Sequence, residues 1–286
     1  MDMETVRFDG EKKFQLKDVR TDDTGKFHAK AEAEEATRQN IGIMIEEQGK
    51  LYAQGRQSLL LVFQAMDAAG KDGVISHVMS GLNPQGTAVH SFKQPTAEEL
   101  SHDYMWRVNR HLPARGMIGI FNRSYYEEVL VVRVHGLVGS EKIPEEFTGH
   151  IWERRYEQIR NYEKYLRENG IVPVKFFLNV SKEEQKKRLL SRIEDKAKNW
   201  KFSESDIKER RYWDQYQRCY EEAIGATATP YAPWYVIPAD KKWYTRYLVS
   251  AIVAQQLRDM HLKYPEVGPD QQSVLEKYRV LLGEDR

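Results

Sequence analysis

The stretch FQAMDAAGKDG, residues 63–73, follows the apolar run LLLVF (59–63) and precedes a segment that suits a helix. It nearly fits the pattern G-x-x-x-x-G-K-[ST], a loop whose backbone N–H groups cradle phosphates and whose lysine reaches the outer ones. Two positions depart from the pattern, because Ala65 replaces the first glycine and Asp72 replaces the serine or threonine. A loose match often arises by chance, so the rest of the chain has to decide whether a phosphate-binding loop is present.

The amino-acid composition limits the classes of protein to which the chain can belong. The chain has 286 residues, 41% of them hydrophobic, which fits one large α/β domain or two small ones. Basic and acidic residues nearly balance, 44 against 43, so the whole chain has no basic excess of the kind that nucleic-acid binders carry. Any anionic substrate must therefore be held by locally clustered cations.

The chain also carries signals about its compartment. The one cysteine, Cys219, excludes an intramolecular disulfide and a cysteine-based zinc site. The N-terminal segment is mixed-charge and lacks the apolar core of a signal peptide. No apolar run approaches the roughly 20 residues of a membrane helix. These features predict a soluble, cytoplasmic protein that does not associate with a membrane.

Short apolar runs recur along the chain at intervals that suit strands. Runs of this kind are typical of strands buried on both faces of a parallel sheet. Strands that alternate with helices predict a three-layer α/β domain, here with five parallel strands. The runs are LLLVFQA (59–65), TAVHSF (87–92), MIGIFN (117–122), VPVKFFLNV (172–180) and WYVIP (234–238).

Helix signals lie between these runs. Apolar residues from Trp152 to Leu166 form one stripe at helical spacing. Ser181 with Glu184 is a capping box, Ser203 with Asp206 is a weaker one, and Asp240 is expected to cap the last long helix of the domain. We predict an N-terminal arm and helix over 1–50, an α/β domain over 51–265 with a helical lid at about 183–210, and a helical tail over 266–286.

The loop at 64–73 should lie at the carboxyl end of the first long strand, where ligands bind in open α/β sheets. Gly70 and Gly73 allow a close approach of the backbone, and Lys71 is the candidate phosphate lysine. Asp67 would repel phosphates unless a metal bridges them, so we interpret it as a Mg²⁺ ligand. The plain alternatives are a solvated surface lysine for Lys71 and a turn or cap for Asp67.

Further cations follow the other strands. Lys93, Asn122 and Arg123 each come directly after a predicted strand, and Arg133 lies ten residues beyond Arg123. Arginine can hold phosphate bidentately, although a structural ion pair explains Arg123 and Arg133 as well. In the predicted lid, Arg188 and Arg192 are four residues apart and share a helix face. A basic lid suits phosphoryl transfer, whereas an ordinary charged helix is the alternative.

Five segments together resemble the family-2 polyphosphate kinases in order and spacing, over about residues 50 to 255. The resemblance implies a P-loop fold similar to that of thymidylate kinases and Mg²⁺-assisted (or Mn²⁺-assisted) phosphoryl transfer between inorganic polyphosphate and a nucleotide. Many members carry Asp where this chain has Asn122, which shifts the expected metal ligand to Asp67. The segments are AMDAAGKDG (65–73), KQPTAEEL (93–100), FNRSYYEEVLVVRVH (121–135), WKFSESD (200–206) and APWYVIPADKKW (232–243).

The resemblance assigns roles to individual residues. Catalysis is expected from Asp67, Lys71, Arg123 and Arg133, and metal binding from Asp67. Phosphate or polyphosphate binding is expected from Ala68, Ala69, Gly70, Lys71, Asp72, Gly73, Lys93, Arg123 and Arg133. Nucleotide binding is expected from Asn83, Asn122 and Arg123, and lid closure from Arg188 or Arg192.

The implied partners are polyphosphate and AMP, ADP and ATP, with GMP and GDP as further candidates and no nucleic acid. The motifs look most like the subgroup that phosphorylates nucleoside mono- and diphosphates, and the family suggests a homo-oligomer, a dimer or tetramer. One alternative is an ATP-dependent nucleoside monophosphate kinase, against which Ala65 and Asp72 argue. Another is a non-catalytic module that binds polyphosphate or nucleic acid, which would leave Asp67 unexplained.

Overall fold

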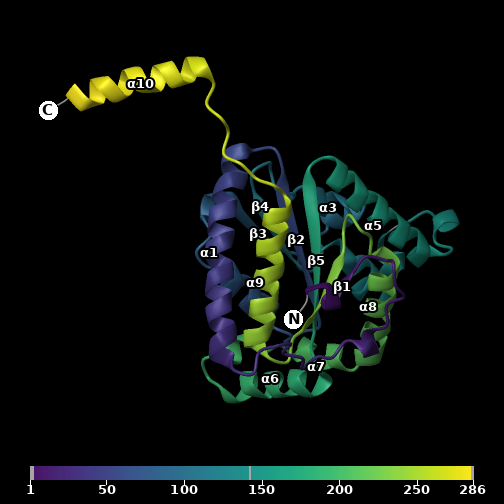
Figure 1. Ribbon diagram of the computed structural model, residues 1–286. Coiled ribbons are helices and arrows are strands. Elements are labelled where there is room, and N and C mark those ends of the chain that lie inside the picture. Colours follow the sequence, from purple (N-terminus) through teal and green to yellow (C-terminus); the bar gives the residue numbers. More distant parts are fainter. Residues whose placement is uncertain (1–2, 142, 285–286) are drawn as a thin grey trace.

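The computed structural model describes residues 3–141 and 143–284, built around one twisted sheet (Figure 1). Its strand order is β1-β6-β5-β2-β4-β3. Five strands are parallel, and the two-residue β1 (Arg7–Phe8) pairs antiparallel with β6. The sheet is therefore mixed and six-stranded, and the predicted count of five was wrong. The parallel strands are β2 (Ser58–Ala65), β3 (Thr87–Ser91), β4 (Ile118–Asn122), β5 (Ile171–Asn179) and β6 (Trp234–Pro238).

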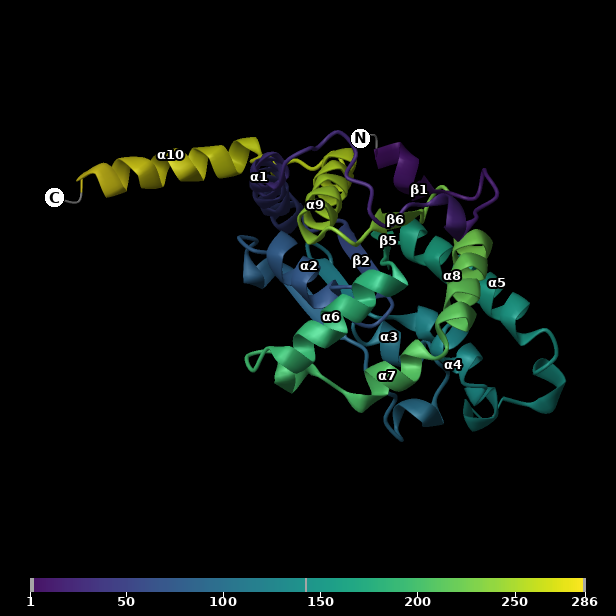
Figure 2. The same cartoon turned by 90° about the horizontal axis from the view of Figure 1, so that it is seen from below.

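Helices cover both faces of the sheet (Figures 1 and 2). On one face, α1 (Lys30–Gln54) and α9 (Lys242–Asp259) pack side by side, and α2 (Lys71–Val78) packs against α9. On the other face, α5 (Ile151–Glu168) packs on β5 and against α8 (Trp213–Thr227). The layers are thus helix, sheet and helix.

The remaining elements are short or peripheral. Helices α6 (Lys182–Glu194) and α7 (Glu204–Arg210) cross the end of the sheet where β5 ends, and α10 (Pro269–Glu284) projects away from the body (Figure 1). Two helices, α3 (Trp106–Asn109) and α4 (Val131–Val134), are single turns. The 3-10 turns are η1 (Met3–Val6), η2 (Leu16–Asp18), η3 (Pro84–Gly86), η4 (Glu99–Ser101), η5 (Tyr125–Val129), η6 (Leu137–Glu141), η7 (Glu145–Phe147) and η8 (Asn199–Lys201).

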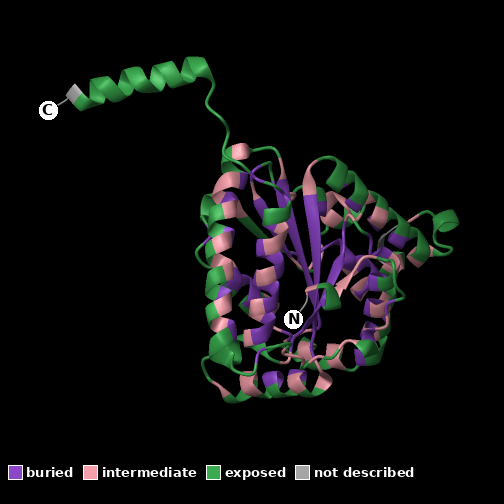
Figure 3. Cartoon of the chain, viewed as in Figure 1, coloured by how far each residue is buried: buried purple, intermediate pink, exposed green. Residues whose placement is uncertain are grey.

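Burial follows position in the sheet (Figure 3). All eight residues of the central strand β2 are buried, as its continuous apolar run predicts. Strand β3 lies at the edge, and its Ala88, Val89 and Ser91 are exposed. The prediction of burial on both faces was therefore wrong for β3, because an edge strand has a neighbour on one side only.

The N-terminal arm packs on the body, where Phe14 and Leu16 are buried. The predicted cap Ser181 is confirmed, since its Oγ accepts the Glu184 N–H at 3.1 Å. The predicted cap Asp240 was wrong, because its carboxylate accepts the Ser181 N–H at 2.8 Å and the Thr21 hydroxyl at 2.8 Å. Asp240 thus ties the arm to the end of β5. The first two residues of the predicted arm and the last two of the tail lie outside the described residues.

Among the described helices, none is long and apolar enough to cross a membrane.

Candidate active site

The loop between β2 and α2 wraps around the ammonium group of Lys71. Lys71 begins α2, and its Nζ donates to the Ala65 carbonyl at 3.0 Å. Ala68 and Gly70 have positive φ values of 60° and 107°, which turn the backbone back toward the lysine. Burial, with the nearby Arg123, lowers the pKa of Lys71. The loop therefore has the curvature and the cation that a phosphate-binding loop requires.

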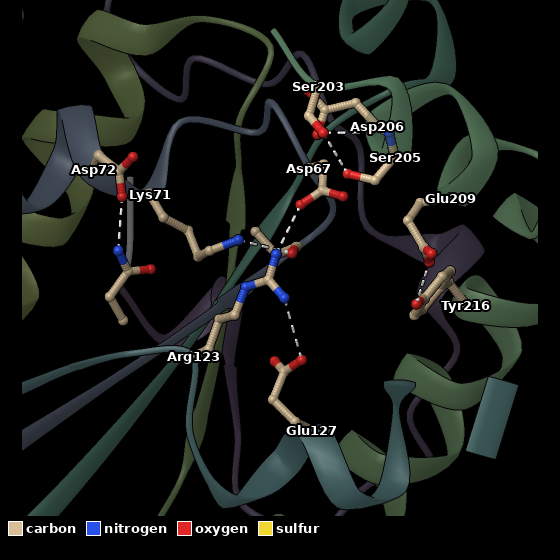
Figure 4. A network of polar contacts seen from close by, with 12 residues as sticks. Asp67, Lys71, Asp72, Arg123, Glu127, Ser203, Ser205, Asp206, Glu209 and Tyr216 are labelled. Atoms are coloured by element: carbon tan, nitrogen blue, oxygen red, sulfur yellow. Dashed lines mark hydrogen bonds and ion pairs between the residues drawn. The ribbon is translucent and has the colours of Figure 1, made fainter. Parts of the chain in front are cut away.

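Arg123 joins this loop from the end of β4 (Figure 4). Its backbone φ is 65°, and its N–H donates to the Phe63 carbonyl at 3.0 Å, which fixes the turn against β2. Its guanidinium lies 3.0 Å from Asp67 Oδ1 and 3.6 Å from Glu127 Oε2. Glu127 and Asp67 raise the pKa of Arg123, which is thus a permanent cation beside Lys71.

Asn122 and Asp72 face each other where a standard loop carries serine or threonine. Asn122 Nδ2 donates to Asp72 Oδ1 at 2.7 Å. The hydrogen bond links the end of β4 to the first turn of α2. This pair lies on the opposite side of Lys71 from Asp67 (Figure 4).

A cavity of about 630 Å³ opens beside the loop. Its walls come from the loop, from the segment after β3, from η5 and from α7. Aromatic and cationic side chains on one wall suit a planar, anionic ligand. The polar and aromatic lining includes Asp67, Phe92, Lys93, Tyr104, Arg107, Arg123, Glu127, Asp206, Glu209 and Arg210.

Carboxylates from the loop and from α7 meet in the cavity. Burial, together with the charge of Asp67, raises the pKa of Asp206, and burial raises the pKa of Glu127. No group of three His, Cys, Asp or Glu residues in the described chain could hold a metal by itself. Mg²⁺ commonly takes one or two carboxylates and completes its shell with water and substrate phosphates. Asp67 and Asp206 fit such an ion, because its charge would relieve their repulsion.

The model of the Polyphosphate kinase 2 (PPK2) family matches residues 27–265. The chain belongs to this family. It is 49% identical to the ADP-polyphosphate phosphotransferase of Rhodopseudomonas palustris over 88% of this chain and 89% of the relative. It is 44% identical to the AMP/ADP-polyphosphate phosphotransferase of Meiothermus ruber over 92% and 96%. The crystal structure of Polyphosphate Kinase 2 from Arthrobacter aurescens superposes with a TM-score of 0.90 at 40% identity, over 99% of this chain and 96% of the other.

In this PPK2 chain, most of the residues predicted for the site converge. The loop from Asp67 to Gly73, Asn122 and Arg123 lie together, and Lys93 lines the same cavity. Arg133 lies elsewhere. Its guanidinium pairs with Glu222 and donates a hydrogen bond to the Tyr156 hydroxyl at 2.9 Å. Asn83 caps η3 by accepting the Gln85 N–H at 3.0 Å.

The two arginines of the predicted lid have different environments. Arg188 is nearly buried, and it donates to the carbonyls of Ala69 and Ala239 at 2.6 Å each. It also donates to the Ala68 carbonyl at 3.2 Å, so it braces the loop from behind. Arg192 instead pairs with Asp206 at 2.8 Å and links α6 to α7.

Several residues of the site were not predicted. Gln185 donates to the Asp67 carbonyl at 2.9 Å, and Glu127, Asp206 and Glu209 supply carboxylates to the cavity. Gln185 lies one turn before Arg188 on α6, so helical spacing alone could have indicated it. The carboxylates carry no such signal, because only the fold of the lid brings α7 opposite the loop.

A buried polar network supports the turn that follows Arg123. Glu163 Oε1 accepts the hydroxyls of Tyr125 and Tyr126 at 2.9 Å each, and Glu163 Oε2 lies 2.7 Å from Lys175 Nζ. Glu163 and Lys175 are fully buried on α5 and β5. Since both tyrosines belong to η5, the network anchors the segment that carries Arg123 and Glu127.

Proposed function

We propose that this chain transfers the terminal phosphoryl group of inorganic polyphosphate to AMP or ADP, reversibly and with Mg²⁺. The observation that carries the proposal is the meeting of Lys71, Arg123 and Asp67 at the mouth of a cavity with aromatic and cationic walls. Relatives that match nearly the whole chain are named for the same reaction, with ADP or with AMP and ADP.

Phosphoryl transfer requires that the reacting groups are positioned and that the negative charge of the phosphates is neutralised. A transferring phosphoryl group spreads negative charge over its oxygens, which permanent cations stabilise in a site shielded from water. Lys71 and Arg123 supply fixed cations, and Glu127 with Asp67 hold the guanidinium in one orientation. Mg²⁺ held by Asp67 and Asp206 would neutralise further charge between the phosphates. No general base is needed, because an acceptor phosphate is already an anionic nucleophile.

The acceptor nucleotide is proposed to lie against the part of the cavity wall that the segment after β3 forms. The partly exposed Tyr104 offers a ring for a base, and the exposed Lys93 offers a cation for its phosphates. GMP and GDP stand with AMP and ADP among the acceptors that we propose, because the sequence motifs do not specify the base. Acceptance of both mono- and diphosphates follows from the motifs and from the relative named for AMP and ADP.

Broader properties complete the proposal. We assign the fold to the P-loop kinases of the thymidylate-kinase type, with α6 and α7 as the lid that closes over the phosphates. A homo-oligomer, a cytoplasmic location and the absence of nucleic-acid and membrane partners stay predictions from the sequence.

The rival kinase would use ATP as donor. A standard nucleotide-cradling loop carries glycine at position 65 and a hydroxyl at position 72, and Asp72 is instead engaged by Asn122. A non-catalytic binder would explain the cations. It would give no reason for Asp67 to hold Arg123 beside Lys71.

The test follows ATP or ADP formation from long-chain polyphosphate, Mg²⁺ and either ADP or AMP. We expect product from both acceptors and a loss of about 100-fold or more in kcat for Lys71→Ala. Lys164→Ala, an exposed lysine on α5, is the matched control and should keep full activity. Product from ADP alone would remove the dual-acceptor assignment. Turnover only when ATP is offered to a nucleoside monophosphate would establish the rival kinase, and polyphosphate binding without turnover would establish the binder.

A further inference from the structure

A second cavity, here called the outer pocket, lies beyond the lid on the arm side. Its volume is about 510 Å³. It is enclosed by the N-terminal arm, the end of β5 and the first turns of α8. None of the roles assigned above uses it. The side chains that matter for its chemistry are Lys17, Arg20, Asp22, Trp213, Gln217, Arg218 and Glu221.

The outer pocket has unsatisfied hydrogen-bond donors. The Gln217 side-chain nitrogen is buried without a hydrogen-bond partner. Within residues 3–141 and 143–284, neither Lys17 nor Arg218 forms an ion pair with a carboxylate. Both acids of the pocket are already engaged, since Asp22 pairs with Arg20 at 3.0 Å and Glu221 accepts the Leu16 N–H at 2.8 Å. A buried donor and unpaired cations together favour an anionic acceptor.

A chain of contacts leads from the phosphate-binding loop to this pocket. Gln185 donates to the Asp67 carbonyl at 2.9 Å and accepts from Arg210 at 2.6 Å. Arg210 lines the central cavity, and its guanidinium lies 6.0 Å from the centre of the Trp213 ring. Trp213 in turn lines the outer pocket. A guanidinium of the central cavity thus lies near an indole of the outer pocket.

Unpaired cations lie along this path near Trp213. Lys182 Nζ lies 5.9 Å from the centre of the Trp213 ring, and Lys182 and Arg210 also lack carboxylate partners in the part of the chain that the structure describes. Four other cations of α6, α7 and the segment between them are paired with carboxylates, namely Arg188, Arg192, Lys198 and Lys208. Two unpaired cations thus lie near the indole, and two more, Lys17 and Arg218, line the outer pocket together with it. Unpaired cations spread over several elements fit a long linear polyanion better than a single compact anion.

We propose that the outer pocket binds a distal segment of the polyphosphate donor. Arg210 and Lys182 lead the chain past Trp213 to Lys17, Arg218 and the Gln217 amide. The inference rests on the proposed function, because it assumes that the reacting end of the donor lies at Lys71. It predicts that long chains gain affinity from contacts that short chains cannot reach.

The experiment compares polyphosphate binding by wild type and by the double variant Lys17→Gln, Arg218→Gln. Titration calorimetry with tripolyphosphate and with long-chain polyphosphate gives Kd, and turnover with each donor gives kcat. We expect Kd for the long chain to rise about fivefold or more, a typical size for partly exposed charge contacts. Kd for tripolyphosphate and kcat should stay at wild-type values. Lys164→Gln, Arg167→Gln removes the same charge from α5 and should change neither constant.

Each other outcome overturns a defined claim. A double variant that binds both donors as wild type does, or that weakens both equally, would overturn the outer pocket as a distal site. A wild-type protein that fails to use any polyphosphate would remove the proposed function, and this inference with it. Circular dichroism of the double variant separates lost contacts from lost folding. Lys17 and Arg218 are both exposed in the wild-type protein.

Discussion

The Asp72–Asn122 hydrogen bond is a departure from a standard phosphate-binding loop, and single substitutions can test its role. Asn122→Asp would place a second carboxylate where the amide now donates to Asp72 at 2.7 Å. Because this pair is partly exposed, we expect a loss of about 1 kcal/mol of unfolding free energy without divalent ions. Millimolar MgCl₂ should restore most of the loss, since a cation between two carboxylates removes their repulsion. Thermal unfolding with and without MgCl₂ measures both effects.

Asn122→Ala is the control for this substitution. It removes the same hydrogen bond and adds no charge, so its unfolding temperature should respond to MgCl₂ as wild type does. If Asn122→Asp and Asn122→Ala respond to MgCl₂ equally, position 122 has no part in a metal site, even as aspartate.

At the residue scale, the sequence predicts the location of residues that follow strands better than the location of residues within helices. Asn122 ends β4 and Arg123 follows it, while the loop that leads to Lys71 follows the adjacent parallel strand β2, so strand order alone brings these residues together. Arg133 was assigned from the family resemblance and Arg188 from its place on the predicted lid helix, and the fold gives each another set of partners. A guanidinium near a site has several carbonyls and carboxylates within reach, and only the fold selects among them.

At the scale of elements, the Glu163–Lys175 pair joins α5 to β5 beneath the turn that carries Arg123. Both charges are fully buried, so removal of one partner leaves the other without compensation. We expect Glu163→Gln to cost about 3 kcal/mol or more of unfolding free energy, measured by urea denaturation. Glu168→Gln is the matched control on the same helix. It loses an exposed pair at 3.9 Å and should cost at most about 0.5 kcal/mol.

A second variant separates charge from packing in this network. Glu163→Leu with Lys175→Met replaces both charges by apolar groups, which is often neutral or stabilising. We expect it to recover much of the loss in Glu163→Gln. A Glu163→Gln protein within about 1 kcal/mol of wild type would show that the pair is not ionised together in the folded state.

The sequence predicted those elements whose hydrophobic pattern extends over many consecutive residues. The apolar runs located all five parallel strands, because buried strands need continuous hydrophobic sequence. Strand β1 was missed, since two residues carry no period and pair only because the arm folds back on β6. Asp240 was misassigned for a similar reason. Its nearest donors come from Thr21 and Ser181, which are distant in sequence.

At the scale of the whole molecule, nearly equal numbers of acidic and basic residues conceal an uneven distribution. The surface pairs many charges, as with Lys164 and Glu168, whereas the carboxyl edge of the sheet gathers cations around Lys71 and Trp213. Net charge therefore excluded a general polyanion binder and could not reveal a local one. The spatial clustering depends on strand order, which composition does not contain.

Helix α10 is the part of the molecule that contributes least to the folded body. Every side chain from Pro269 to Gly283 is exposed, although Leu275, Tyr278 and Leu282 form an apolar stripe at helical spacing. A chain that ends at Val267 loses no buried surface, so its unfolding free energy should stay within about 0.5 kcal/mol of the full chain. Tyr264, which lies against Gly49 of α1, is retained in that chain.

Calorimetry of both chains at two protein concentrations tests this expectation. A helix of this length is marginal in water by itself, so a partner for the stripe would contribute measurably. If the full chain unfolds at a higher temperature that rises with protein concentration, while the shortened chain does not, then α10 packs on a second copy of the chain. A stabilisation independent of concentration would mean that α10 folds onto its own body in solution. Equal unfolding temperatures for the two chains are the result that the exposure of α10 predicts.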